Sequence, residues 1–169
     1  ETTVQLRKSK KDEQMKKKRQ IAGANGLKVS STTEELKEDS NVSFSQPIIT
    51  RIAEHMQVLN RFFSDPGTVP VEPDLLGAVK DLRRLLSVER NPPVDLIIDA
   101  GALPYFVAFL TNNEYPMLQF EAAWALTNIA STSRTKDVAN CDNAVPSLVK
   151  LLYSPSGNVR EQAIWCIGN

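Results

Sequence analysis

Two tryptophan–asparagine pairs are the residues of this chain best suited to hold a ligand. Trp124 is followed by Asn128 and Trp165 by Asn169, each four residues on, and the second pair begins 41 residues after the first. Residues four apart lie on one face of a helix. Indole faces attract the cations of Lys and Arg, and an Asn amide can both donate to and accept from a peptide backbone. The spacing therefore predicts a surface for an extended, cationic peptide.

A helical tryptophan can instead fill the core, and the helical pattern bears on this alternative. At about 100° per residue, Trp124 lies away from the apolar face of its helix, with Asn128 and Glu121 as neighbours. That apolar face comprises Leu118, Ala122, Ala125, Leu126 and Ile129. In the second copy the expected apolar face comprises Val159, Ala163, Cys166 and Ile167, whereas Gln162 shares a face with Trp165 and Asn169. Two copies in register favour a binding surface over core packing.

The helices that position these pairs belong to a repeated unit. The segment Asp99–Pro104 aligns with Cys141–Pro146, 42 residues later. A three-helix unit that recurs about every 40–47 residues is typical of armadillo and HEAT proteins. We therefore expect an all-α fold, a truncated right-handed armadillo-repeat solenoid. Its repeats would comprise residues 47–87, which form an atypical first copy, then 94–131, then a truncated copy at 135–169.

Charge is divided unevenly along the chain. Lys plus Arg and Asp plus Glu both total 20, yet residues 1–20 carry eight basic and only three acidic side chains. Their apolar surface is too small to fold alone, so we expect a basic arm that is disordered or marginally helical. Residues 21–46 are rich in Gly, Ser and Thr and predict a flexible linker. A basic arm on a mildly acidic body binds something anionic, either elsewhere or on its own body.

The sequence argues against an enzyme. His55 is the sole histidine and has no partner at metal-ligand spacing, and Cys141 and Cys166 suggest neither a disulfide framework nor a metal site. There is no phosphate-binding glycine loop, no nucleophile–base constellation and no apolar run long enough to cross a bilayer. We therefore expect no cofactor, no metal, no small-molecule substrate and no membrane insertion.

Four segments of the chain resemble the importin-α (karyopherin-α) family. They occur together and in the family's order, and they are Val4–Arg19, Leu85–Pro93, Gln119–Ser131 and Glu161–Asn169. The resemblance implies an adaptor for nuclear import, which holds the basic nuclear localisation signals of cargo proteins on a Trp–Asn array. It also implies that the arm binds importin-β and that the protein shuttles between cytoplasm and nucleus.

The same resemblance implies roles for individual residues. The signal-binding array would comprise Trp124, Asn128, Trp165, Asn169 and Gln162, with Ser131 and Thr135 at its rim. The arm would bind importin-β and act as an autoinhibitory pseudo-signal through Arg7, Lys8, Lys10, Lys11, Lys17, Lys18 and Arg19. Of these, Lys17, Lys18 and Arg19 match the cluster that occupies the protein's own groove when importin-β is absent.

Two other functions fit helical repeats that carry a basic arm. A nucleic-acid-binding protein would need Lys and Arg near the tryptophans, where this chain has Glu121, Glu161 and Gln162. A general armadillo scaffold would not need the regular Trp–Asn spacing. Both alternatives rank below an import adaptor, and we do not expect nucleic acid as a partner.

Overall fold

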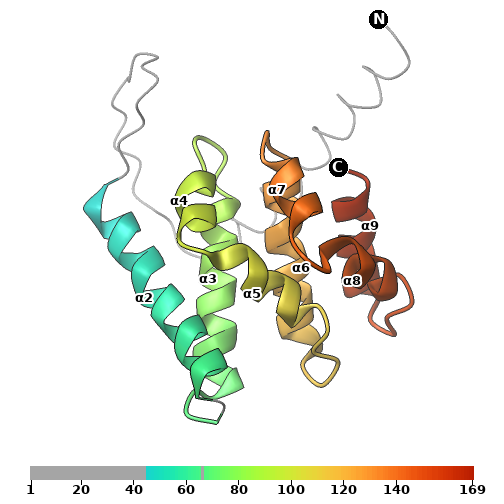
Figure 1. The fold of residues 1–169 in the computed structure, drawn as a ribbon, viewed down its shortest axis with the longest axis horizontal. Helices are drawn as coiled ribbons and strands as arrows, with labels where there is room; N and C mark the ends of the chain where they lie inside the picture. The colour runs from blue at the N-terminus through green and yellow to red at the C-terminus, as the bar shows by residue number, and fades with distance from the viewer. Residues whose placement is uncertain (1–44, 66) are drawn as a thin grey trace, which may run out of the picture. The chain divides into compact units, whose positions relative to one another are not determined.

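The computed structural model describes residues 45–65 and 67–169, and all regular structure within these ranges is helical. The helices are α2 (Gln46–Ser64), α3 (Leu76–Leu86), α4 (Val94–Asp99), α5 (Ala102–Phe109), α6 (Pro116–Ala130), α7 (Thr135–Asn140), α8 (Ala144–Leu151) and α9 (Gly157–Ile167), with a π-helical turn, η1 (Val71–Leu75), before α3 (Figure 1). Of the described residues, those up to Leu86 and Pro93–Asn169 form one compact unit. Among the described residues, Ser87–Pro92 is grouped apart from this unit. The expected basic arm, and the expected linker up to residue 44, lie outside the described residues.

The second and third repeats share a backbone feature at equivalent positions. Gly101 (φ 84°) directly precedes α5, and Asn143 (φ 62°), 42 residues later, directly precedes α8. A left-handed conformation suits Gly, which has no Cβ, and Asn tolerates it better than most residues. Each turn leads from a six-residue helix, α4 or α7, into an eight-residue one. The 42-residue sequence repeat is therefore a repeat of three-dimensional structure.

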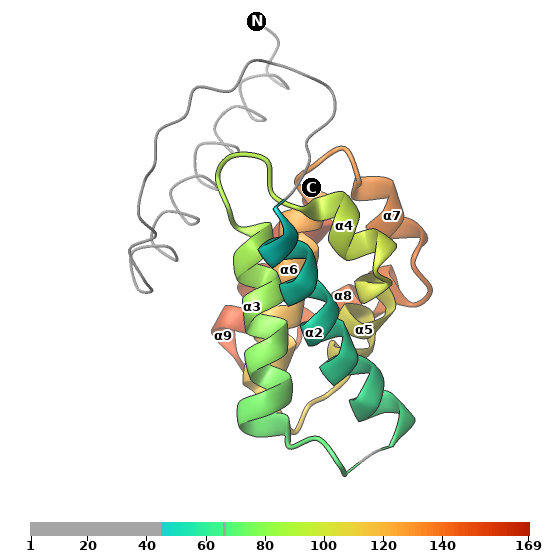
Figure 2. The same cartoon turned by 90° about the vertical axis from the view of Figure 1, so that its left-hand side faces the viewer.

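The third helix of each repeat packs on the third helix of the next. Helix α6 contacts α3 and α9, and it also packs against α5 and α7. Figure 1 shows α6 between α3 and α9, and Figure 2 shows α2 alongside α3. Ala122, Ala123 and Ala125 of α6 are fully buried. Because the distance between packed helices depends on the side chains at the contact, these alanines allow close approach.

The buried faces match the helical pattern on α6 and differ from it on α9. All five residues expected on the apolar face of α6 are buried, and so are Val159, Ala163 and Cys166 on α9. Ile167 is 45% exposed and Ile164 is 60% exposed, so the prediction for Ile167 was wrong. The reason is that α9 packs substantially only on α6 and α8 in the described part of the chain, which leaves its outer flank uncovered. A solenoid repeat buries a face only where a neighbour lies.

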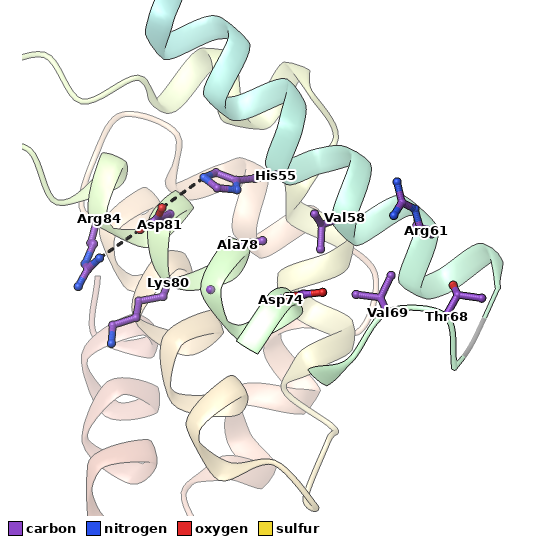
Figure 3. A pocket seen from close by; sticks show the side chains of 11 residues that line it. His55, Val58, Arg61, Thr68, Val69, Asp74, Ala78, Lys80, Asp81 and Arg84 are labelled. Carbon is purple, nitrogen blue, oxygen red and sulfur yellow. Dashed lines mark hydrogen bonds and ion pairs between the residues drawn. The ribbon is translucent and has the colours of Figure 1, made fainter. Parts of the chain in front are cut away.

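Helices α2 and α3 meet at a charged cluster beside a cavity of about 430 Å³ (Figure 3). Asp81 of α3 accepts hydrogen bonds from Arg51 of α2 (3.1 Å) and from Arg84 (3.2 Å). His55 Nε2 lies 3.5 Å from Asp81 Oδ2 but forms no hydrogen bond with it. Burial lowers the pKa of His55 below its ordinary value of 6.5, and Asp81 opposes this only in part. Burial would raise the pKa of Asp81, but hydrogen bonds and charge from Arg51, and a hydrogen bond from Arg84, hold it below 3.8.

Stability should fall on mild acidification because of His55. Below pH 6.5 the unfolded chain binds a proton at His55 that the folded state, with its lowered pKa, resists. The free energy of unfolding should therefore decrease as the pH drops from 7.5 to 5.5, and His55→Gln should flatten that decrease. Urea denaturation at both values measures the effect. Asp81 loses its contribution to stability only below pH 3.8, because its pKa in the folded state is lower than that value. Asp81 therefore does not titrate between pH 7.5 and 5.5. An equal decrease in the wild-type and His55→Gln proteins would contradict the assignment.

Candidate functional site

The two tryptophans lie outside the buried core. Trp124 of α6 and Trp165 of α9 are both half-buried, whereas Ala123 and Ala125 beside Trp124, and Cys166 beside Trp165, are buried. Because α6 and α9 pack side by side, the two rings come from adjacent helices at equivalent positions of consecutive repeats. Neither ring is therefore fully buried in the hydrophobic core.

Arg83 of α3 lies against Trp124 and was missed in the sequence analysis. Its guanidinium carbon lies 4.3 Å from the centroid of the Trp124 ring. Its Nε donates to Glu121 Oε2 over 2.6 Å, and both side chains are about 95% buried. Phe120 packs at a tilt on the same indole, with 5.5 Å between centroids. Arg83 and Glu121 thus form a buried ion pair between α3 and α6, directly beside the ring.

A signal for Arg83 is present in the sequence. Arg83 precedes Trp124 by 41 residues, and Trp124 precedes Trp165 by the same number. Arg83 therefore occupies in the first repeat the position that tryptophan occupies in the next two. A search for the repeated tryptophan alone passes over it, because the first repeat carries a cation where the others carry an indole.

The amide side chains are less open than the helical pattern predicts. Asn128 and Gln162 are buried, and Asn169 is half-buried. Asn169 Nδ2 donates to the carbonyl oxygen of Thr127 over 3.2 Å, and Thr127 Oγ1 lies within hydrogen-bond distance of the Gln162 carbonyl oxygen (3.1 Å). Polar groups on this flank therefore join α6 to α9. A helical wheel treats each helix alone and does not include contacts with the neighbouring repeat.

Ser131 and Thr135 lie where α6 ends and α7 begins. Ser131 Oγ donates to the carbonyl oxygen of Asn128 over 2.7 Å, and Thr135 Oγ1 is 2.7 Å from the carbonyl oxygen of Ala130. The last carbonyl groups of a helix have no partner within the helix, so these hydroxyls satisfy two of them. Both residues therefore shape the turn next to Asn128.

A carboxylate accompanies each indole. Glu121 precedes Trp124 by three residues and is held by Arg83. Glu161 precedes Trp165 by four residues and is exposed, and Trp165 Nε1 donates to its Oε1 over 3.5 Å. Indole faces beside carboxylates attract cations and repel phosphates.

Other chemistries find little support in the described residues. Burial raises the pKa of Cys166 to about 12, and burial with the charge of Asp142 raises that of Cys141, so neither thiol is a ready nucleophile. No group of His, Cys, Asp and Glu within the described ranges could hold a metal ion. The cavity in Figure 3 is lined by none of the predicted binding residues. None of the described helices is long and apolar enough to cross a membrane.

The Arg83–Glu121 pair should respond strongly to the loss of one partner. Glu121→Ala leaves a buried guanidinium without its carboxylate, which should lower the free energy of unfolding by about 3–5 kcal/mol. The double variant Arg83→Met/Glu121→Leu should recover most of that loss. Urea denaturation measures both changes, and Glu161→Ala, the exposed equivalent on α9, is the control and should change stability by less than about 0.5 kcal/mol. Equal losses for Glu121→Ala and Glu161→Ala would contradict the buried pair.

Comparison with known proteins identifies the family. The importin beta binding domain matches residues 1–64, the armadillo/beta-catenin-like repeat matches 90–131, and the HEAT-like repeat matches 116–169. These matches and the helical repeats confirm the expected armadillo-repeat fold.

Named relatives extend over nearly the whole chain. Importin subunit alpha-2 of Arabidopsis thaliana is 42% identical over 167 residues, which are 98% of this chain and 29% of that protein. Importin subunit alpha of Saccharomyces cerevisiae is 41% identical over 163 residues, 94% of this chain and 28% of that protein. Importin subunit alpha-1b of Oryza sativa subsp. japonica is 53% identical over 107 residues, 63% of this chain and 19% of that protein. The chain thus spans less than a third of the length of these relatives. It belongs to the importin-α family, whose members are transport adaptors and not enzymes.

Proposed function

We propose that this chain acts in nuclear import, as part of an adaptor that shuttles between cytoplasm and nucleus. In this proposal the repeats bind the basic localisation signals of cargo proteins, and the segment matched by the importin beta binding domain, residues 1–64, binds importin-β. The observation that carries the proposal is the pair of half-buried indoles on adjacent helices, each with a carboxylate nearby. The relatives named importin subunit alpha support it.

The indole rings are the proposed source of most of the affinity. A Lys or Arg side chain can pack its apolar stem along an indole and hold its cation near the ring face. Each such contact contributes about 0.5–2 kcal/mol, depending on desolvation. Glu161 is exposed beside Trp165, so its carboxylate adds attraction for the same cation. Rings on successive repeats would select basic side chains from an extended strand.

The polar residues around the rings are the proposed contacts of the peptide backbone. We assign this role to Asn128, Gln162 and Asn169, with Ser131 and Thr135 at the rim. Since Asn128 and Gln162 are buried and Asn169 donates to Thr127, these amides should contribute less to binding than the indoles. Loss of a ring should therefore weaken peptide binding more than loss of an amide.

The basic arm is the proposed internal competitor of the cargo signal. Residues 1–20 carry five more basic than acidic side chains, whereas residues 21–169 carry five more acidic than basic ones. Opposite charges on two parts of one chain favour their association. In this proposal Lys17, Lys18 and Arg19 occupy the indole surface until importin-β binds the arm, with Arg7, Lys8, Lys10 and Lys11 contributing to the importin-β contact.

Peptide titration tests the proposed function. A fluorescent Lys–Arg-rich peptide should bind the full chain more tightly after Lys17, Lys18 and Arg19 are replaced by Ala, because the internal competitor is removed. In that background, Trp124→Ala and Trp165→Ala should each weaken binding by about 2- to 30-fold, and Asn128→Ala by less. Fluorescence anisotropy measures all five affinities.

Tyr153→Ala provides the matched control. Tyr153 is an aromatic residue just after α8 in the last repeat and is 87% exposed, so its loss should leave peptide affinity unchanged. If both tryptophan variants bind as tightly as Tyr153→Ala, the indoles do not form the binding surface and the proposed function fails.

A further inference from the structure

We propose that the Arg83 side chain fills a cation site on Trp124 and thereby limits how far a basic peptide can extend along the repeats. The inference rests on the proposed function and adds to it a specificity-determining residue. Arg83 makes with the Trp124 ring, at 4.3 Å, the contact that a peptide Lys or Arg would make. That side of the ring is therefore already filled by the protein itself.

The position of Arg83 in the repeat explains why it limits the surface. Arg83, Trp124 and Trp165 stand 41 residues apart, on α3, α6 and α9. Helix α6 packs against both α3 and α9, and Arg83 covers the indole from the α3 side. A peptide cation can approach Trp124 from the side shared with Trp165. Beyond Trp124, toward α3, it would meet a site that Arg83 already fills and where Glu121 is already paired.

The buried ion pair keeps Arg83 in this site. Arg83 is only 4% exposed, and its Nε donates to Glu121 Oε2 over 2.6 Å. A peptide cation that displaced Arg83 from Glu121 would leave a buried guanidinium without its counter-charge, which is strongly unfavourable. A cargo peptide therefore cannot displace Arg83 from this site.

Removal of Arg83 should open the site to peptide. Glu121 would then be a carboxylate beside an indole, the same combination that Glu161 and Trp165 present. A Lys or Arg of the peptide could take the place of Arg83 and pair with Glu121. The binding surface would then have one more cation site, on the α3 side of Trp124.

A positional peptide series tests the inference on the full chain with Lys17, Lys18 and Arg19 replaced by Ala. The parent peptide is a short Lys–Arg-rich segment flanked by alanines, and each further peptide carries one lysine in place of one flanking alanine. The measured quantity is the affinity gain from each lysine. In Arg83→Gln, whose amide can still donate to Glu121, the gain should rise about 5- to 10-fold over wild type at one flanking position. In wild type that lysine should change affinity less than 2-fold, an expectation based on the filled site.

Three variants separate this inference from simpler effects. Arg84→Gln removes the adjacent, half-exposed arginine that pairs with Asp81 and should leave every positional gain unchanged. Arg83→Gln/Glu121→Gln should abolish the new gain, because the carboxylate is lost. Arg83→Ala should reproduce the gain seen in Arg83→Gln, and far-ultraviolet circular dichroism checks that each variant remains helical.

The outcomes distinguish the inference from the proposed function. If the parent peptide binds, and binding depends on Trp165, but no flanking lysine gains affinity in Arg83→Gln or Arg83→Ala, the inference is overturned and the proposed function stands. If the parent peptide does not bind any folded variant, both are overturned. A gain of equal size in Arg84→Gln would also overturn the inference, since it would reflect lost positive charge and not an opened site.

Discussion

The packing of α6 between α3 and α9 is the constraint on which the candidate site depends. Fully buried alanines at 122, 123 and 125 let the neighbouring helices approach α6 closely. That close approach brings Arg83 onto one side of the Trp124 ring and lets Thr127 and Asn169 join α6 to α9. A larger residue at any of these alanines would separate the helices and displace the rings relative to one another. The peptide surface is thus a consequence of how repeats stack.

The electrostatics of the surface depend on two glutamates in different environments. Glu121 is neutralised by Arg83, while Glu161 is exposed beside Trp165. The two indoles therefore differ in environment although they occupy equivalent positions. Trp124 contacts Arg83, which is paired with the buried Glu121, whereas Trp165 lies beside the exposed Glu161. Under the proposed function, the end of the array near α3 is closed by the protein and cargo engages the surface from Trp124 onward.

Much of the helical architecture could be predicted from the sequence, because similar residues recur at a regular spacing. The 42-residue spacing that relates Gly101 to Asn143 appears as two left-handed turns, and the apolar face expected for α6 is buried. What could not be predicted depends on contacts between repeats. Ile167 is exposed because none of the described helices covers its flank, and Asn169 donates to Thr127 because α6 lies beside it. Arg83 was missed because the repeat was traced through tryptophan, and only the 41-residue spacing from Arg83 to Trp124 marks its position.

Intrinsic fluorescence tests the central claim, that the indoles contact a basic strand, most directly. The chain has two tryptophans, Trp124 and Trp165, so its indole emission reports on the proposed surface alone. Titration with a Lys–Arg-rich peptide that lacks aromatic residues should shift or quench this emission and saturate at the concentration where anisotropy of the labelled peptide saturates. Binding that is complete by anisotropy and leaves the emission unchanged would contradict the account, because the peptide would then lie away from both rings.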